Sequence, residues 1–118
     1  ADSSITVIAT AYYKPLKNQG EFYRGSYEKE VQMNGSGKKT FSGKNPQIGM
    51  IAADPRVLPI GTVLKIPGYG LGVVEDKGSR INGMRIDLFM GSGERGLKKA
   101  LAWGKKTSNY QDIKNGLS

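Results

Sequence analysis

Three aspartates lie inside apolar, strand-like stretches of the chain, and this placement strongly constrains the fold. They are Asp54, Asp76 and Asp87, and each follows a run rich in aliphatic residues. A carboxylate buried in β structure is costly unless hydrogen bonds or an opposite charge compensate it. We therefore expect a fold that either satisfies these carboxylates or holds them near the surface for chemistry.

The composition excludes several kinds of active site. The 118 residues contain no histidine and no cysteine, which removes histidine-based triads, cysteine nucleophiles, thiolate or imidazole zinc sites and disulfide bonds. Carboxylates, lysines and tyrosines remain for proton chemistry. The cations Arg56, Lys77 and Arg85 beside the aspartates disfavour a divalent metal ion, so we expect neither metal nor cofactor. A chain of this length forms one domain, here 1–118, with one core.

The net charge of +8 predicts attraction to polyanions, and nucleic acid, anionic membrane and anionic cell-wall polymer satisfy it equally. The basic residues are spread along the chain and no nucleic-acid-binding module is recognisable, so we expect no nucleic-acid partner.

No apolar run reaches 18 residues, which predicts no integral membrane segment. No signal segment opens the chain, so we expect a mature or trimmed domain. The sequence sets no oligomeric state.

Short strands separated by Pro and Gly dominate the pattern and predict a barrel or sandwich. The expected strands cover residues 4–13, 48–53, 62–66, 71–75 and 84–90.

Two other segments have a different character. Residues 14–47 are polar and glycine-rich, which predicts a long loop with a short hairpin around 22–31, either a rim of a binding groove or an insertion without a role. A helix is expected over 93–104, capped by Ser92, with Leu97, Ala100 and Leu101 on its buried face.

Several motifs occur in the order found in one known family. They are Ala9-Thr-Ala-Tyr12, Thr40-Phe-Ser-Gly43, the three aspartate segments and Trp103-Gly104. Over about residues 5–104 the chain resembles the three-aspartate (3D) domain, which is similar to the catalytic barrel of membrane-bound lytic transglycosylase A. The family also occurs in stationary-phase survival proteins of spore-forming bacteria. The resemblance implies a mainly β fold, a six-stranded double-psi β-barrel with one or two short helices. The polar segment 105–113 departs from the family's apolar final strand, which leaves closure of the barrel by 105–118 unassigned.

Asp87 is the candidate catalytic acid. Strand alternation places it on one face with Arg85 and Phe89, where the residues alone favour a surface ion pair with Arg85. The family resemblance implies instead that this carboxyl donates a proton to the glycosidic oxygen and later takes one back. Its pKa must then be raised by burial or by a like charge nearby.

The two other aspartates are candidates for the same site. Asp76 lies 11 residues before Asp87, and a hairpin would bring them together, so Asp76 either adds a like charge or orients Asp87. The alternative is a turn aspartate that bonds amides of the Gly78 loop. Asp54 precedes Pro55 and is expected to bond backbone amides two residues on, although the resemblance counts it in the catalytic cluster.

Six residues form the predicted substrate-binding set. Tyr12 can hydrogen-bond or stack on a sugar, or can simply belong to the core. The resemblance implies that the turn containing Thr40, Ser42 and Gly43 borders the groove. Lys77 and Gly78, directly after Asp76, complete the set.

The resemblance thus implies a peptidoglycan lytic transglycosylase. It would cleave the β-1,4 bond between N-acetylmuramic acid and N-acetylglucosamine and leave 1,6-anhydro ends, with glycan strands as its partner and an extracytoplasmic location, secreted or bound to the cell wall. Two alternatives are a wall-binding module without catalysis, and a hydrolase that uses Asp76 and Asp87 as a carboxylate pair.

Overall fold

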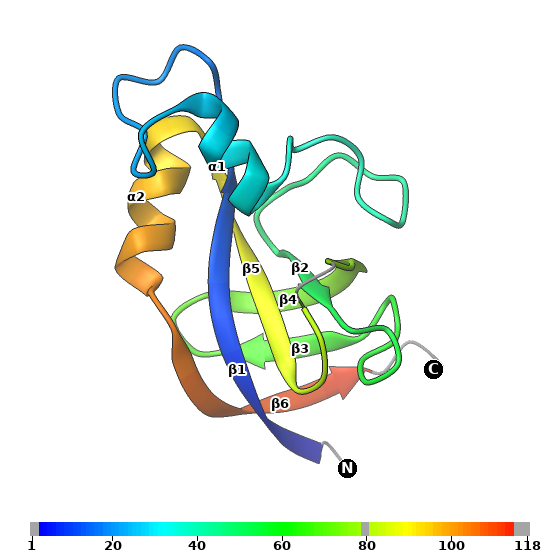
Figure 1. Ribbon diagram of the computed structural model, residues 1–118. Coiled ribbons are helices and arrows are strands. Elements are labelled where there is room, and N and C mark those ends of the chain that lie inside the picture. The colour runs from blue at the N-terminus through cyan, green and yellow to red at the C-terminus, as the bar shows by residue number, and fades with distance from the viewer. Residues whose placement is uncertain (1–2, 79–80, 115–118) are drawn as a thin grey trace.

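The computed structural model describes residues 3–78 and 81–114 and shows a closed barrel with two short helices outside it (Figure 1). The strands are β1 (Ser3–Lys14), β2 (Met50–Ala53), β3 (Val63–Ile66), β4 (Gly70–Asp76), β5 (Arg85–Ser92) and β6 (Lys106–Lys114). The helices are α1 (Tyr27–Asn34) and α2 (Gly93–Trp103). The predicted six-stranded barrel is confirmed. No helix in the described ranges has the length and apolar character needed to cross a membrane.

The strand order around the barrel is β1-β5-β2-β4-β3-β6. β1 and β5 are parallel, β2 and β4 are parallel, and the remaining pairs are antiparallel. The predicted hairpin between Asp76 and Asp87 is therefore wrong, because β2 lies between β4 and β5. This insertion gives the backbone groups of β2 hydrogen-bonding partners on both sides.

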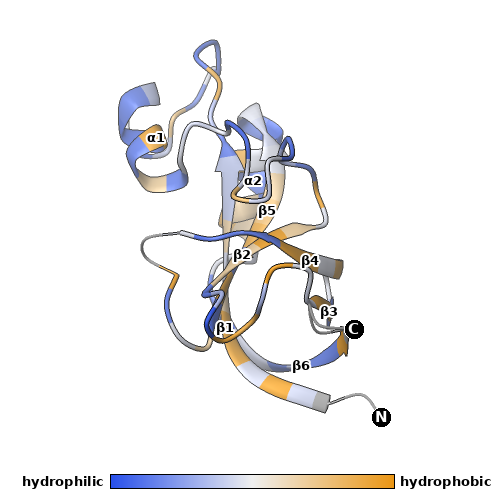
Figure 2. Cartoon of the chain, turned by 90° about the vertical axis from the view of Figure 1, so that its right-hand side faces the viewer, coloured by the Kyte–Doolittle hydropathy of each residue, from blue (hydrophilic) through white to orange (hydrophobic). Residues whose placement is uncertain are grey.

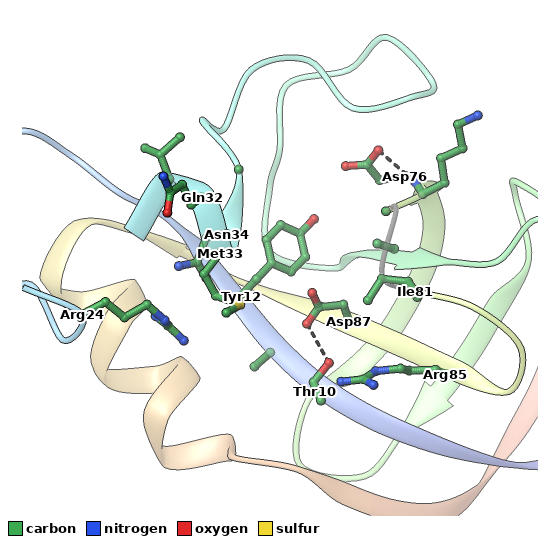
Figure 3. Close-up of a pocket in the computed structure, with 16 residues that line it drawn as sticks. Thr10, Tyr12, Arg24, Gln32, Met33, Asn34, Asp76, Ile81, Arg85 and Asp87 are labelled. Atoms are coloured by element: carbon green, nitrogen blue, oxygen red, sulfur yellow. Dashed lines mark hydrogen bonds between the residues drawn. The ribbon is translucent and has the colours of Figure 1, made fainter. Parts of the chain in front are cut away.

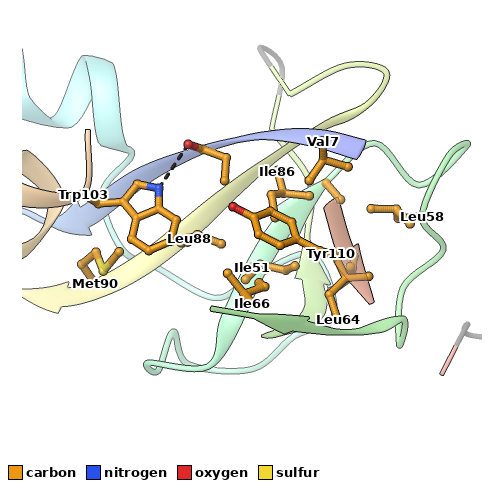
Figure 4. Close-up of a cluster of buried hydrophobic side chains, with 13 residues drawn as sticks. Val7, Ile51, Leu58, Leu64, Ile66, Ile86, Leu88, Met90, Trp103 and Tyr110 are labelled. Carbon is orange, nitrogen blue, oxygen red and sulfur yellow. Dashed lines mark hydrogen bonds between the residues drawn. The ribbon is translucent and has the colours of Figure 1, made fainter. Parts of the chain in front are cut away.

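Aliphatic side chains that alternate along the strands fill the barrel (Figure 4). Figure 2 shows this alternation most clearly along β1, whereas much of α1 is hydrophilic. Trp103, at the end of α2, joins the core and its Nε1 donates to the carbonyl oxygen of Ala9 at 3.1 Å. The helix predicted over 93–104 is thus present, although Ser92 makes no capping hydrogen bond with its side chain and Leu101 is exposed.

A helix replaces the hairpin predicted around 22–31. α1 begins after Ser26, whose side chain accepts from the amide of Lys29 at 3.2 Å, and it ends at Gly35, whose φ is +86°. Its one fully buried residue is Glu30. An apolar stripe is therefore absent, which is why the sequence pattern does not indicate this helix.

The polar C-terminal segment closes the barrel. β6 pairs antiparallel with both β1 and β3, and Tyr110, opposite Ile5, is the residue that it contributes to the core. Most other described residues of β6 are exposed, so backbone pairing rather than apolar burial places this strand. Residues 115–118 lie outside the described part of the chain.

Candidate functional site

Ala52 on β2 brings two of the predicted site residues together. It is the register partner of Asp76 on β4 and of Asp87 on β5. All three line a cavity of about 490 Å³ that lies between the barrel and α1 (Figure 3). The small side chain of Ala52 leaves open space between the carboxylates, and residues 31–35 form the facing wall.

Asp87 has the properties required of an acid catalyst. It is partly buried, and its Oδ1 accepts a hydrogen bond from Thr10 Oγ1 at 3.0 Å. Burial raises the pKa of Asp87 to about 6, while the Thr10 bond and the charge of Arg85 oppose that rise. Among the described residues, no ion pair joins Asp87 to Arg85. The carboxyl therefore titrates near neutral pH inside an accessible cavity.

Tyr12 presents an unused hydroxyl to the same cavity. Its ring packs against Phe89 with centroids 5.3 Å apart, and its buried hydroxyl has no hydrogen-bond partner in the described chain. Burial, followed by the negative charges of Asp76 and Asp87, raises the pKa of Tyr12 far above its usual range. The phenol therefore stays protonated, and it points toward the space between the two carboxylates (Figure 3).

Asp76 has a structural role at the end of β4. Its Oδ1 accepts from the amides of Phe41 and Lys77, both at 2.9 Å. The turn-aspartate interpretation is thus supported on the side of Lys77. Burial, rather than the charge of Asp76, is the cause that raises the pKa of Asp87. Lys77 and Gly78 line the cavity as well.

The turn at 40–44 is fastened to β4 beside the cavity. The amide of Ser42 donates to the carbonyl of Glu75 at 3.1 Å, and the hydroxyls of Thr40 and Ser42 lie 3.0 Å apart. None of Thr40, Ser42 and Gly43 is among the residues that line the cavity. Their described contacts position the Asp76 end of β4.

Asp54 lies apart from this pair. Its Oδ1 accepts from the amide and Nε of Arg56, both at 3.0 Å, and its Oδ2 accepts from Arg56 Nη2 at 2.9 Å and from the amide of Gly83 at 3.0 Å. The predicted bond to the amide two residues on is present. The hydrogen bonds from Arg56, its side chain first, and from Gly83 hold the pKa of Asp54 well below its usual range. Asp54 does not line the cavity, and within the described ranges no three carboxylates gather as a metal site.

Among the cavity residues that sequence reasoning missed are two with polar side chains near the aspartates or on the facing wall, Thr10 and Arg24. Thr10 carried a signal, because it lies two residues before Tyr12 on one face of the same strand. Arg24 carried none, since its place depends on α1, which the sequence did not indicate.

The family model of the 3D domain matches residues 49–111. The chain belongs to the 3D domain family. It is 35% identical over 107 residues to the cell wall-binding protein YocH of Bacillus subtilis, a match that covers 91% of this chain and 31% of YocH.

Solved structures share the fold of this 3D domain. MltA of Escherichia coli, a lytic transglycosylase, superposes with a TM-score of 0.54 at 23% identity, over 68% of this chain and 28% of MltA. A structure of MltA with bound chitohexaose gives a TM-score of 0.51 at 22% identity, over 62% of this chain and 26% of MltA. The likeness confirms the double-psi barrel. The 3D domain chain spans less than a third of each of these relatives.

Proposed function

We propose that this 3D domain cleaves the β-1,4 bond between N-acetylmuramic acid and N-acetylglucosamine in peptidoglycan, as a lytic transglycosylase with Asp87 as acid and base. The observation that carries this proposal is the pKa of Asp87, raised to about 6 by burial in an accessible cavity. A general acid works best when its pKa lies near the working pH. The fold shared with MltA supports the same reaction class.

The reaction needs one carboxyl group and no water. Asp87 donates its proton to the glycosidic oxygen, and the bond between that oxygen and C1 breaks with its electron pair on the leaving oxygen. The muramic acid C6 hydroxyl then attacks the oxocarbenium-like C1 and returns its proton to Asp87, which closes the 1,6-anhydro ring. The protonated hydroxyl of Tyr12 is placed to hydrogen-bond the sugar between the two carboxylates.

The proposed partner is the glycan strand of the cell wall, and the proposed location is outside the cytoplasm. The match to a cell wall-binding protein supports this partner. The net charge of +8 favours an anionic wall through attraction that salt screens.

Two observations favour other functions. The relative YocH is named for binding rather than cleavage, which favours a wall-binding module. Asp76 and Asp87 flank β2, so two strand spacings of about 4.8 Å separate their backbones, a scale that suits a carboxylate pair with a water molecule between them.

Mass spectrometry of digested, purified peptidoglycan separates the three functions. A lytic enzyme releases anhydro muropeptides that are about 18 mass units lighter than hydrolytic products, because no water is added. Reducing-end products alone mean hydrolysis by the carboxylate pair. Binding to the wall without soluble product on prolonged incubation means a binding module.

A further inference from the structure

Glu30 is a fully buried carboxylate that the proposed reaction does not use. Its Oε2 accepts from the hydroxyl of Tyr13 on β1, and its Oε1 accepts from Arg24 Nη1 at 2.7 Å. Burial, together with this bond to Glu30, raises the pKa of Tyr13 to about 12, so the phenol keeps the proton that it donates. A buried ion pair adds little net stability, because desolvation offsets the attraction. The consequence of this arrangement is geometric, since it fixes Arg24 relative to α1 and β1.

The guanidinium of Arg24 reaches the cavity from the α1 side. Its side chain lines the cavity that contains Asp87 and remains 32% exposed (Figure 3). An arginine carries five N–H donors in a planar fork. Glu30 Oε1 is the hydrogen-bond acceptor found for them in the described chain, and Arg24 Cζ lies 5.4 Å from the centre of the Tyr23 ring. The ring covers a face of the guanidinium, so N–H donors on its edge remain for a ligand.

The other described basic residues around the cavity are engaged differently. Lys77 Nζ lies 4.3 Å from the centre of the Phe41 ring on an exposed turn. Arg85 lies on the same strand face as Asp87, whose pKa its charge lowers, and its buried Nε has no hydrogen-bond partner in the described chain. Arg24 thus differs from both, because a buried carboxylate orients it on the wall across from the acidic pair.

We propose that Arg24 binds a carboxylate of the muramic acid residue or of the peptide attached to it, and so makes the cavity select acidic muramyl glycan over neutral glycan. This inference rests on the proposed peptidoglycan substrate. A planar guanidinium matches a carboxylate through paired hydrogen bonds. Muramic acid carries a lactyl group whose carboxyl is either free or linked to a peptide that has carboxylates of its own, whereas an N-acetylglucosamine oligomer has none.

The test compares three glycans of equal length by calorimetric titration. They are a glycan with its peptides, the same glycan after removal of the peptides, and a chitooligosaccharide. Every protein carries Asp87→Asn, so that turnover does not disturb the titration. Arg24→Ala is combined with Glu30→Gln, because Glu30 would otherwise stay buried without its cation. Lys65→Ala removes one exposed charge on β3, away from the cavity, and is the matched control.

The double substitution should weaken binding of an acidic glycan by about 10- to 100-fold, the range for a hydrogen bond to a charged group. Chitooligosaccharide binding should change by less than about twofold, and the control should leave all three affinities equally unchanged. Weakening confined to the peptide-bearing glycan assigns the peptide carboxylates. Weakening confined to the peptide-free glycan assigns the lactyl carboxylate, which is free only there, and weakening on both means that Arg24 binds either carboxylate.

A second variant tests the role of Glu30 as a positioning residue. Glu30→Gln alone leaves the Arg24 charge in place and removes the carboxylate that orients it, so only acidic glycans should lose affinity. Two results would overturn the inference. One is an equal loss of affinity for all three glycans, and the other is a folded double variant that binds both acidic glycans as tightly as the parent protein does. Selective losses in the titration, together with no anhydro product from the chain that retains Asp87, would leave this inference standing and reject the lytic reaction alone.

Discussion

Thr10 and Asp87 are register partners on the parallel strands β1 and β5, and the Thr10 hydroxyl donates to Asp87 Oδ1 at 3.0 Å. This bond stabilises the ionised carboxylate and lowers its pKa, against the rise that burial causes. Thr10 therefore lowers the pH above which the proposed acid is without its proton.

Thr10→Val should move the alkaline limb of the pH–rate profile to higher pH. Loss of a hydrogen bond to the charged form raises the carboxyl pKa, and a bond of ordinary strength corresponds to about 0.5 to 1 pH unit. The limb of the unmodified protein should lie near pH 6. Thr10→Ser retains the hydroxyl and is the control. An alkaline limb of Thr10→Val that lies at the same pH as the control, or at a lower pH, would contradict the effect of the Thr10 hydroxyl on the Asp87 pKa.

Asp87→Asn should lower turnover by about 10²- to 10⁴-fold, because the amide keeps the shape of the carboxyl but cannot transfer a proton. Release of muropeptides from purified peptidoglycan measures this. A folded Asp87→Asn protein with near-normal release would rule out Asp87 as the acid.

The stability of the Asp87→Asn protein should depend on pH relative to the unmodified chain. The folded pKa of about 6 lies above the ordinary value of 3.8, so the folded state holds its proton more tightly and stability falls as pH rises between these values. The amide escapes this loss, which predicts a gain of about 1 to 3 kcal/mol above pH 6 and none below pH 4. Urea unfolding of both proteins at pH 4 and pH 7 measures this gain. An equal difference in unfolding free energy at the two pH values would contradict burial as the cause of the raised Asp87 pKa.

Asp76→Asn should leave the alkaline limb where it is. The pKa of Asp87 is raised by burial, and the amide oxygen of an asparagine can still accept from the amides of Phe41 and Lys77. Asp76→Ala removes the acceptor and should loosen the 40–44 turn, seen as faster amide exchange at Phe41. A limb that moves toward lower pH in Asp76→Asn would restore Asp76 as a like charge acting on Asp87.

Asp54→Asn should lower Tm by about 4 to 8 °C at pH 7, through loss of the paired bonds with Arg56. Because the pKa of Asp54 is depressed, its contribution is present above about pH 4 and is lost as pH falls further. The Tm difference between the two proteins should therefore shrink at pH 2 to 3. Muropeptide release per folded molecule should fall less in Asp54→Asn than in Asp87→Asn. A loss as large as that of Asp87→Asn would show that Asp54 takes part in the reaction.

Activity should not require a divalent cation. Asp54 lies outside the cavity, bound by Arg56, which leaves Asp76 and Asp87 as the carboxylates of the original three that face it. Release of muropeptides should be unchanged by a chelator. Loss of release that Mg²⁺ or Ca²⁺ restores would contradict this prediction.

The barrel was predictable because most of its strands carry a local signal. Runs of β-branched residues mark β1, β3 and β4, and the Asp-Pro-Arg sequence anticipated the turn at Asp54. The strand order was not predictable, since Ala52 meets Asp76 and Asp87 through pairings between distant segments. No local sequence pattern indicates which strand lies between two others in a sheet.

The missed part of the site has a physical cause as well. α1 is held to β1 by polar contacts to Glu30 and Asn34 rather than by an apolar face. From sequence alone, a glutamate in a hydrophilic segment is predicted to be exposed to solvent, because glutamate is rarely fully buried. The position of Arg24 depends on that glutamate, so the sequence did not indicate that Arg24 lines the cavity.

The closure of the barrel by β6 has a consequence for how the chain acquires its fold. β1 and β6 pair residues as far apart as Ser3 and Asp112, so β1 lacks one of its two neighbours until residue 112 has been synthesised. Closing so long a loop costs conformational entropy before the strand pairing contributes any stabilisation, which makes the folding of such proteins slow. The barrel therefore closes only after β6 has been synthesised, and until then β1 and β3 each present an unpaired edge to which another chain can add a strand.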